Sequence, residues 1–186
     1  MDYIYSAIFG FVQGITEFLP ISSSGHLVIL HEFINLPVKN ELIFDIIMHL
    51  ATLFAVLWFF RQEIGQILKS WFFSLRGRKN DLSRIGWLII LGTIPAALAG
   101  WLLGDFIEVA FRSPSIVAVM LIVIGGFFIV FEKISSFQNN LEKLNWRRSL
   151  LIGLAQVVAF IPGTSRSGVT IIAGMGVGRS EIKRLR

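Results

Sequence analysis

The stretch Ile85–Gly104, IGWLIILGTIPAALAGWLLG, decides the fold class, because none of its 20 residues carries a charge. An apolar α-helix of about 20 residues crosses a hydrocarbon core of roughly 30 Å. Ser113–Phe131 is also free of charge, and Ile46–Phe60 reaches across the core when it is counted from Leu42. A chain of 186 residues has no soluble core that would bury three such helices on all faces. The sequence therefore predicts an all-α membrane protein that crosses the bilayer several times.

The charged residues indicate which loops lie inside. Only 16% of the residues are charged, against about 25% in soluble domains, and they gather between the apolar stretches. Arg61–Arg84 holds six lysines and arginines against two acids, and Glu132–Arg148 holds four against two. Asp105–Arg112 and Asn35–Asp45 each hold one against two. The positive-inside rule predicts that the first pair is cytoplasmic and the second pair is outside. The net charge of +5 is thus explained without a nucleic-acid partner.

Two further apolar regions are interrupted by proline, glycine and serine. Each reads as a helix, a break and a helix of about ten residues that is too short to span, which is typical of a re-entrant hairpin. Irregular backbone at membrane depth is tolerated only where protein or a water-filled cavity surrounds it. The helix, break and short helix are Tyr3–Phe18, Pro20–Gly25 and Gly25–Ile34 in the first region, and Ser149–Ile161, Pro162–Gly168 and Val169–Gly178 in the second.

The two interrupted regions resemble each other and face opposite ways. With two one-residue gaps, their shared pattern is Gly10-x-x-Gln13, then Phe18-Leu19-Pro20-x-Ser22-Ser23-x-Gly25, against Gly153-x-x-Gln156, then Phe160-Ile161-Pro162-x-Thr164-Ser165-x-x-Gly168. Three spans lie between them, so the first hairpin ends outside and the second, followed by the basic segment Arg179–Arg186, ends inside. We therefore expect one membrane domain over 1–186 with an inverted-topology repeat, the first copy at about 1–133 and the start of the second at about 145–186. Such repeats are frequent in transporters.

The chemistry of the two breaks suits an oxyanion, and phosphate best. Each break precedes a helix whose first turn offers free N–H groups and the positive end of the helix dipole. Arg166 adds a forked cation, and a charged residue between apolar helices is a functional hypothesis by default. The alternatives are ordinary helix capping by the serines and an Arg166 side chain that reaches the membrane surface. The candidate phosphate ligands are Ser22, Ser24, Gly25, Thr164, Ser165 and Ser167.

Glu17 lies in the otherwise charge-free run Tyr3–His26, one helical turn after Gln13. Two oxygen ligands at this spacing, together with phosphate oxygens, suit Mg²⁺ or Ca²⁺. A simple ion pair between Glu17 and Arg166 is the alternative explanation.

His26 follows the serine run, where we expect it in the first turn of a helix within reach of Ser22 or Ser23. A serine and a histidine beside an anion site suit a nucleophile and a proton carrier. His31 and His49 have no comparable neighbours in the sequence, and we interpret them as interface or core residues. Asp45 and Asp105 are interpreted as loop or span-end residues.

The string from Gln13 to His26, QGITEFLPISSSGH, together with Pro162–Gly168, PGTSRSG, resembles the undecaprenyl-diphosphate phosphatase family of bacterial membranes, also called the bacitracin-resistance family. The resemblance runs the whole length of the chain. It implies a multi-pass enzyme of the bacterial inner membrane that removes the terminal phosphate from undecaprenyl diphosphate. The monophosphate carrier that results serves cell-wall glycan synthesis, and the active site opens toward the outer face.

The resemblance also implies roles for individual residues. Glu17 and Gln13 fall at the acidic, cation-associated motif, where Gln13 replaces a glutamate of many relatives. Ser23 falls at the nucleophile or phosphate ligand, and His26 at the acid/base. Arg166 falls at the phosphate-binding arginine. Further membrane helices follow in the family, so we expect this sequence to be a piece of a longer chain.

We therefore predict a membrane hydrolase that acts on a polyprenyl diphosphate with the help of a divalent cation. Membrane lipids are expected to surround it, and a homodimer is compatible with the sequence. A flippase or transporter for lipid phosphate or another anion is the alternative, because the inverted repeat favours transport and the site could bind without hydrolysing. A structural membrane subunit would not explain why the charged residues Glu17 and Arg166 lie between apolar stretches.

Overall fold

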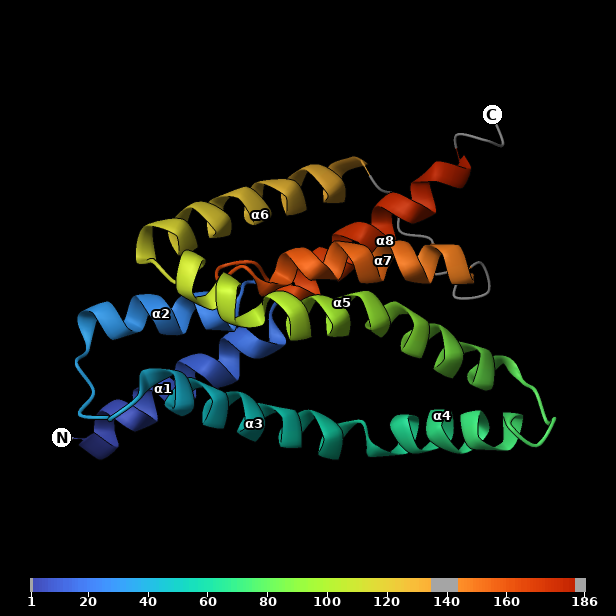
Figure 1. Cartoon of the computed structure of the whole chain (residues 1–186), viewed down its shortest axis with the longest axis horizontal. Helices are drawn as coiled ribbons and strands as arrows, with labels where there is room; N and C mark the ends of the chain where they lie inside the picture. The colour runs from blue at the N-terminus through green and yellow to red at the C-terminus, as the bar shows by residue number, and fades with distance from the viewer. Residues whose placement is uncertain (1, 135–143, 183–186) are drawn as a thin grey trace.

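The computed structural model describes residues 2–134 and 144–182, and every element in these ranges is helical (Figure 1). The predicted basic segments Glu132–Arg148 and Arg179–Arg186 lie partly outside the described residues. The elements in chain order are α1 (Asp2–Phe18), α2 (Ser23–Phe33), α3 (Glu41–Phe59), α4 (Arg61–Ser74), α5 (Asp81–Phe111), α6 (Pro114–Ile134), α7 (Trp146–Val157), the 3-10 turn η2 (Val158–Phe160) and α8 (Arg166–Ile182).

Among the described residues, three helices are long and apolar enough to cross a membrane, as the sequence predicts. They are α3, the part Asp81–Gly104 of α5, and the part Pro114–Lys133 of α6. Between 6% and 17% of the apolar window of each is buried inside the protein. Side chains as large as Trp58, Trp101 and Ile122 therefore face outward, which is stable only where lipid replaces water.

Two segments differ from the prediction. The basic segment predicted as a loop after the first span contains helix α4, which packs its aromatic residues on α5, where the rings of Trp71 and Trp87 lie 5.6 Å apart. The predicted outer turn Asp105–Arg112 is wrong, because α5 continues to Phe111. No residue in 105–111 breaks a helix, and the chain turns only before Pro114, whose ring disfavours a helical conformation at the preceding residue. The side chain of Asp105 lies outside the described residues.

The two predicted interruptions are present as breaks between helices. α1 ends at Phe18 and α2 begins at Ser23, while α7 ends before η2 and α8 begins at Arg166. Ser22 has a φ of 66°, a left-handed conformation that is uncommon for residues other than glycine, asparagine and aspartate and is often found at functional sites. Gly163 has a φ of 89°, which glycine adopts without strain.

The breaks meet each other beside α6 (Figure 1). A Cβ at Gly25 would lie 2.9 Å from Gly163 Cα, and a Cβ at Gly168 would lie 3.2 Å from Pro20 O. A Cβ at Gly163 would lie 2.5 Å from the carbonyl oxygen of Val117 on α6. The absence of side chains at these glycines is thus what lets the two breaks touch. The polar residues of the two breaks are therefore brought together at one place in the protein.

Candidate active site

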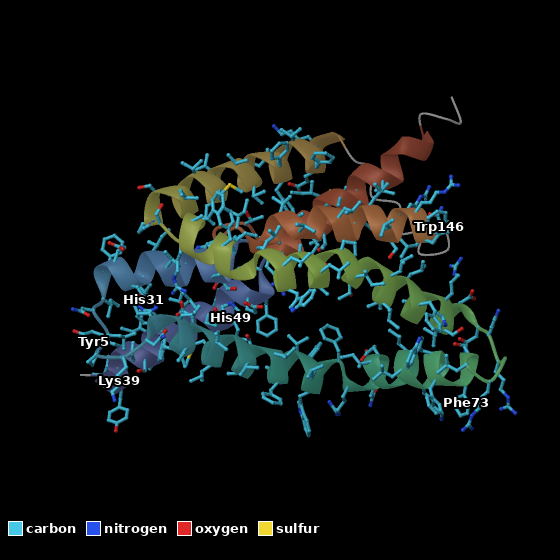
Figure 2. The ribbon with its side chains drawn as sticks, in the orientation of Figure 1. Tyr5, His31, Lys39, His49, Phe73 and Trp146 are labelled. Atoms are coloured by element: carbon cyan, nitrogen blue, oxygen red, sulfur yellow. The ribbon has the colours of Figure 1, made fainter. Side chains whose placement is uncertain are left out.

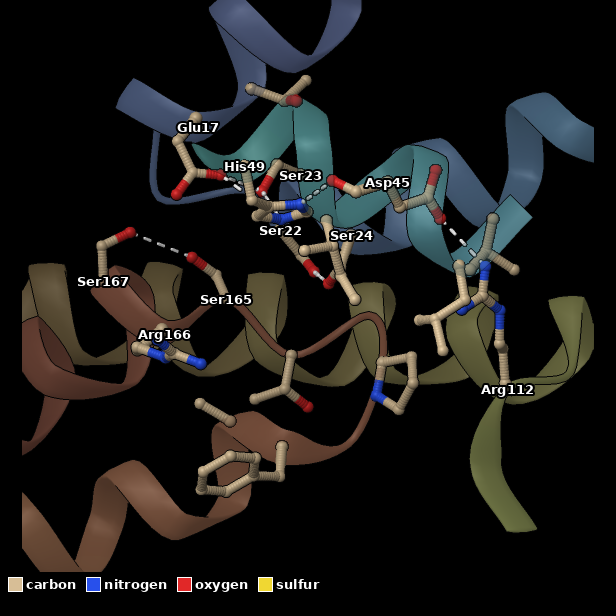
Figure 3. Close-up of a pocket in the computed structure, with 18 of the residues that line it drawn as sticks. Glu17, Ser22, Ser23, Ser24, Asp45, His49, Arg112, Ser165, Arg166 and Ser167 are labelled. Atoms are coloured by element: carbon tan, nitrogen blue, oxygen red, sulfur yellow. Dashed lines mark hydrogen bonds and ion pairs between the residues drawn. The ribbon is translucent and has the colours of Figure 1, made fainter. Parts of the chain in front are cut away.

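A cavity of about 840 Å³ lies where the two breaks meet. Its wall is built by α1, α2, α3, the end of α5 and the segment from η2 into α8 (Figure 3). Eight of the predicted site residues line it: Glu17, Ser22, Ser23, Ser24, Thr164, Ser165, Arg166 and Ser167. Gly25 is buried against the second break, and Gln13 is buried behind Glu17.

One wall carries a hydrogen-bonded cluster around Ser23 (Figure 3). The hydroxyl of Ser23 donates a short hydrogen bond to Glu17 Oε2, and the amide of Gln13 donates to the same oxygen at 2.9 Å. His49 Nε2 lies 3.5 Å from Ser23 Oγ and 3.7 Å from Glu17 Oε2. The side chains of Glu17 and His49 are about a third exposed, at 33% and 37%, and both line the cavity. A molecule in the cavity thus has access to this cluster.

The facing wall carries hydroxyl groups and a cation. Thr164 is buried, lines the cavity, and its hydroxyl has no hydrogen-bond partner among the described residues. Such a buried orphan is uncommon in proteins and leaves a donor for a ligand. Arg166 begins α8, with its guanidinium carbon 5.8 Å from the ring centre of Phe160. This wall can neutralise and hold the oxygens of a phosphate group.

The two breaks use the same capping pattern at the start of α2 and α8. Ser22 Oγ accepts from the N–H of Gly25 at 3.4 Å, and Ser165 Oγ accepts from the N–H of Gly168 at 3.1 Å. The pattern aligns Ser22 with Ser165, not with Thr164 as the gapped sequence comparison does. Ser23 and Arg166 then occupy the same position, the first residue of their helices. The remaining N–H groups of each first turn have no partner within the helix, and the residues that carry them, Ser23, Ser24, Arg166 and Ser167, line the cavity, where an anion is favoured.

The residues present fit a divalent cation beside Glu17. Gln13 Oε1 is buried and has no hydrogen-bond partner among the described residues, although buried amide oxygens are normally paired. The amide of Gln13 is next to a carboxylate that faces the cavity, toward which it turns its Nε2, and carboxylate and amide oxygens are ligands that Mg²⁺ and Ca²⁺ prefer. Within 2–134 and 144–182, no group of three or more His, Cys, Asp or Glu side chains is arranged so that it could hold a metal ion. Phosphate oxygens and water would therefore supply most of the other ligands, as is usual for Mg²⁺.

The ion pair between Glu17 and Arg166, the alternative explanation for these charges, is not found in the part of the chain that the structure describes. Glu17 bonds to Ser23 and Gln13 instead. Both charged groups line the cavity, so each can meet a ligand.

The histidines are arranged differently from the prediction. His26 is in the first turn of α2, but its Nδ1 bonds to the carbonyl oxygen of Ser22 at 2.8 Å, and the ring does not line the cavity. The interpretation of His49 as a core or interface residue without polar neighbours is wrong, because this ring contacts Ser23 and Glu17. The signal that would have found it is the polar series Asp45, His49 and Thr52 along one face of an apolar span.

His31 and Asp45 also have partners that the sequence did not indicate. Asp45 is buried at the start of α3 and pairs with Arg112 Nη2 at 2.9 Å and with His31 Nε2 at 3.0 Å. The cluster joins α2, α3 and the end of α5 at the edge of the cavity, and Figure 3 shows its Asp45–Arg112 pair.

The comparisons with known proteins agree on one family. The family model described as "Bacitracin resistance protein BacA" matches residues 6–185. The chain is 44% identical over 183 residues to "Undecaprenyl-diphosphatase 1" of Pseudoalteromonas translucida, covering 97% of this chain and 68% of the relative. It is 44% identical over 179 residues to "Undecaprenyl-diphosphatase" of Teredinibacter turnerae, covering 96% and 67%. It is 45% identical over 186 residues to "Undecaprenyl-diphosphatase 2" of Stutzerimonas stutzeri, covering 97% and 68%.

Proposed function

Because the chain belongs to the bacitracin resistance protein BacA family, we propose that its cavity is the site where undecaprenyl diphosphate is hydrolysed to undecaprenyl phosphate and inorganic phosphate. The activity is that of a membrane hydrolase that recycles a lipid carrier for cell-wall synthesis, and the family name implies bacitracin resistance. The substrate is a lipid, which fits a site set among apolar helices.

A single observation carries the proposal for the site. The hydroxyl of Ser23, held by the carboxylate of Glu17, faces a wall of phosphate-binding groups across one cavity. Binding of an anion alone does not require a carboxylate that accepts a hydrogen bond from a serine. A phosphoryl transfer to the serine requires such a group, since the serine must be oriented toward phosphorus and must lose its proton.

In this mechanism the terminal phosphate lies between the two breaks. Arg166, the hydroxyl of Thr164 and the first N–H groups of α2 and α8 stabilise the charge that spreads over its oxygens in the transition state. Ser22, Ser24, Ser165 and Ser167 complete this binding surface, while the predicted ligand Gly25 is buried behind it. Ser23 attacks the terminal phosphorus, and the lipid phosphate leaves. The resemblance implies a role for His26 in proton transfer, but its ring does not line the cavity.

A divalent cation, Mg²⁺ or Ca²⁺, would be held by Glu17 and Gln13 and would neutralise part of the diphosphate charge. The buried, unpartnered Gln13 Oε1 supports this assignment.

The arrangement of the helices supports a topology as part of the proposal. Helix α2 and helix α8 are re-entrant, and the two halves of the chain are inverted repeats whose breaks meet in the membrane. The site opens to the outer face, and the loop between α4 and α5 is cytoplasmic because it is the most basic of the loops. The expected homodimer stays a prediction.

The test is phosphate release from undecaprenyl diphosphate by the purified protein in detergent, measured with Mg²⁺, with Ca²⁺ and with a chelator. We expect release that depends on the cation. A folded protein that binds the lipid but releases no phosphate under any of these conditions would contradict hydrolysis. Movement of the lipid across the bilayer of a reconstituted vesicle would then favour the transporter.

A further inference from the structure

We propose that His49 is a catalytic residue of this chain, the group that takes the proton from Ser23 when the serine attacks phosphorus. The proposal rests on the proposed function and adds to it a residue from α3, a helix outside both breaks. Four observations carry it: the hydrogen bond at Nδ1, the neighbours of Nε2, the access to the cavity, and the contrast with His26.

The hydrogen bond at Nδ1 sets the protonation of the ring. His49 Nδ1 lies 2.8 Å from the carbonyl oxygen of Asp45, one helical turn earlier. A carbonyl oxygen only accepts hydrogen bonds, so Nδ1 carries the hydrogen. In the neutral imidazole Nε2 then holds the free lone pair, which makes it an acceptor for a proton.

Nε2 lies near a hydroxyl that can give it a proton and near a carboxylate that can stabilise the charged ring. It lies 3.5 Å from Ser23 Oγ, the proposed nucleophile, and such contacts are often longer without substrate than in the reacting complex. It also lies 3.7 Å from Glu17 Oε2, so the imidazolium that forms is stabilised by a carboxylate. Glu17 Oε2 already accepts hydrogen bonds from Gln13 and Ser23, so the one hydroxyl proton of Ser23 turns from Glu17 toward His49 Nε2 before it is transferred. Glu17 then stabilises the charged ring, while His49 takes the proton.

His49 also has the access that a proton carrier needs. Its side chain is 37% exposed and lines the cavity, where it can exchange protons with water (Figure 3). His31, in contrast, is 5% exposed, bonds to Asp45 and does not itself line the cavity.

His26 offers an internal comparison. Its Nδ1 makes the same kind of bond to a backbone carbonyl one turn earlier, at the same 2.8 Å. The two rings are therefore fixed in the same tautomer, and they differ in what surrounds Nε2. Only His49 has a hydroxyl and a carboxylate beside it and lines the cavity.

The step balances in protons and electrons. Ser23 Oγ forms a bond to the terminal phosphorus as its proton moves to His49 Nε2, and the bond from phosphorus to the bridging oxygen breaks, with its electron pair going to the departing lipid phosphate. His49 then gives the proton to solvent. In the second half a water molecule attacks the phosphoserine, its proton moves to His49, and the Ser23 oxygen leaves and takes that proton back. The sum is hydrolysis by one water molecule.

The test measures turnover, lipid binding and thermal stability for His49→Gln in detergent, beside the wild type. Glutamine keeps a polar side chain but carries no titratable nitrogen, so a merely structural role would survive the change. We expect turnover to fall about 10²–10⁴-fold, the usual contribution of general acid–base catalysis, while lipid binding stays within a few-fold of the wild type. His31→Gln is the matched control: it removes another histidine that bonds to Asp45, and we expect its turnover per folded molecule to stay near that of the wild type.

The contradicting result is a folded His49→Gln protein that keeps more than about a tenth of the wild-type turnover, especially where His26→Gln loses it. If His49→Gln does not fold, a folded His49→Ala protein decides the matter: acceleration by added imidazole supports the proposal, and no acceleration overturns it. A wild type that releases no phosphate contradicts the proposed function itself, which separates the two failures.

Discussion

At the scale of single residues, the site depends on two small motifs with the same geometry. Each places a serine cap, one variable residue and a second serine before a buried glycine, Ser22–Gly25 in one case and Ser165–Gly168 in the other. The variable position is serine in the first motif and arginine in the second. The matching geometry of the two motifs places the proposed nucleophile and the proposed phosphate-binding cation at corresponding positions, facing one cavity.

Several site residues could be predicted at this scale, and one could not. Glu17 and Arg166 are conspicuous because each interrupts a long apolar stretch. His49 was missed because it lies 26 residues from Ser23, and only the packing of α3 on α1 brings them together. The match of Ser22 with Ser165 also could not be predicted, because the sequence does not show which serine caps which glycine.

Gly163→Ala tests the close contact between the breaks. Alanine at this φ of 89° costs about 1–2 kcal/mol from the backbone conformation. Its Cβ would also lie 2.5 Å from Val117 O, and such overpacking adds about 1–3 kcal/mol. The matched control is Gly77→Ala, since Gly77 has a φ of 85° but open space around its Cβ position. Thermal unfolding in detergent should show a larger loss for Gly163→Ala, and equal losses would contradict the contact.

At the scale of elements, the helices hold the breaks in position through close contacts. The tightest is between α5 and α7, where a Cβ at Gly153 would lie 2.1 Å from the carbonyl oxygen of Gly92. Ser149 adds a hydrogen bond from its hydroxyl to the carbonyl oxygen of Leu88. Small residues that let helix backbones approach are a common basis of packing in membranes, where burial of apolar surface contributes little.

Gly153→Ala should therefore separate α5 from α7. We expect a loss of stability of about 1–3 kcal/mol or more, with lower turnover because α7 leads directly into the second break. Gly125→Ala on α6 is the control, because nothing lies within 4 Å of its Cβ position, and it should be neutral or slightly stabilising. Unfolding midpoints of the two variants check this, and a Gly153→Ala protein as stable as the control would show that the contact does not hold the helices.

The Asp45 cluster joins three elements and gives a second test. Arg112→Met leaves the buried carboxylate of Asp45 without its guanidinium partner, which should cost about 3 kcal/mol. Asp45→Asn combined with Arg112→Met should cost less than Arg112→Met alone, because no buried charge is left unpaired. The free energy of unfolding of the single and double variants measures the difference. A double variant less stable than Arg112→Met would contradict the role of this pair.

The boundaries of the elements show where sequence patterns lose information. The three long apolar helices could be predicted because their length and lack of charge are dictated by the bilayer. The extension of α5 to Phe111 could not, because charge marks the membrane boundary and not the end of a helix. Helix α4 was missed for the same reason: its charged residues read as a loop, while its aromatic residues pack on α5.

At the scale of the whole molecule, the chain has two distinct ends. Figure 2 places Tyr5, His31 and Lys39 at one end, and Phe73 and Trp146 at the other, with His49 between them. The second end carries the basic segment between α4 and α5. The proposed topology puts this end in the cytoplasm and the Lys39 end outside.

Single cysteines test that topology, since the sequence has none of its own. Lys39 and Lys79 are exposed and lie in segments between helices, so Lys39→Cys and Lys79→Cys should both fold. A membrane-impermeant maleimide added to spheroplasts should label Lys39→Cys directly and Lys79→Cys only after permeabilisation. The reverse pattern would place the cavity mouth on the cytoplasmic side.

The central claim is that the two breaks form one phosphate-transfer site, and the most direct test is phosphate release by Ser23→Ala, Arg166→Ala and the double variant. Each single change should lower turnover by at least about 100-fold in a folded protein, since each removes a group that acts on the transition state. The double variant should be little slower than the worse single variant, because residues that act as a unit are not additive. A single variant that releases phosphate at the wild-type rate would contradict a single site built from both breaks. So would a double variant whose fold-loss in turnover equals the product of the two single losses.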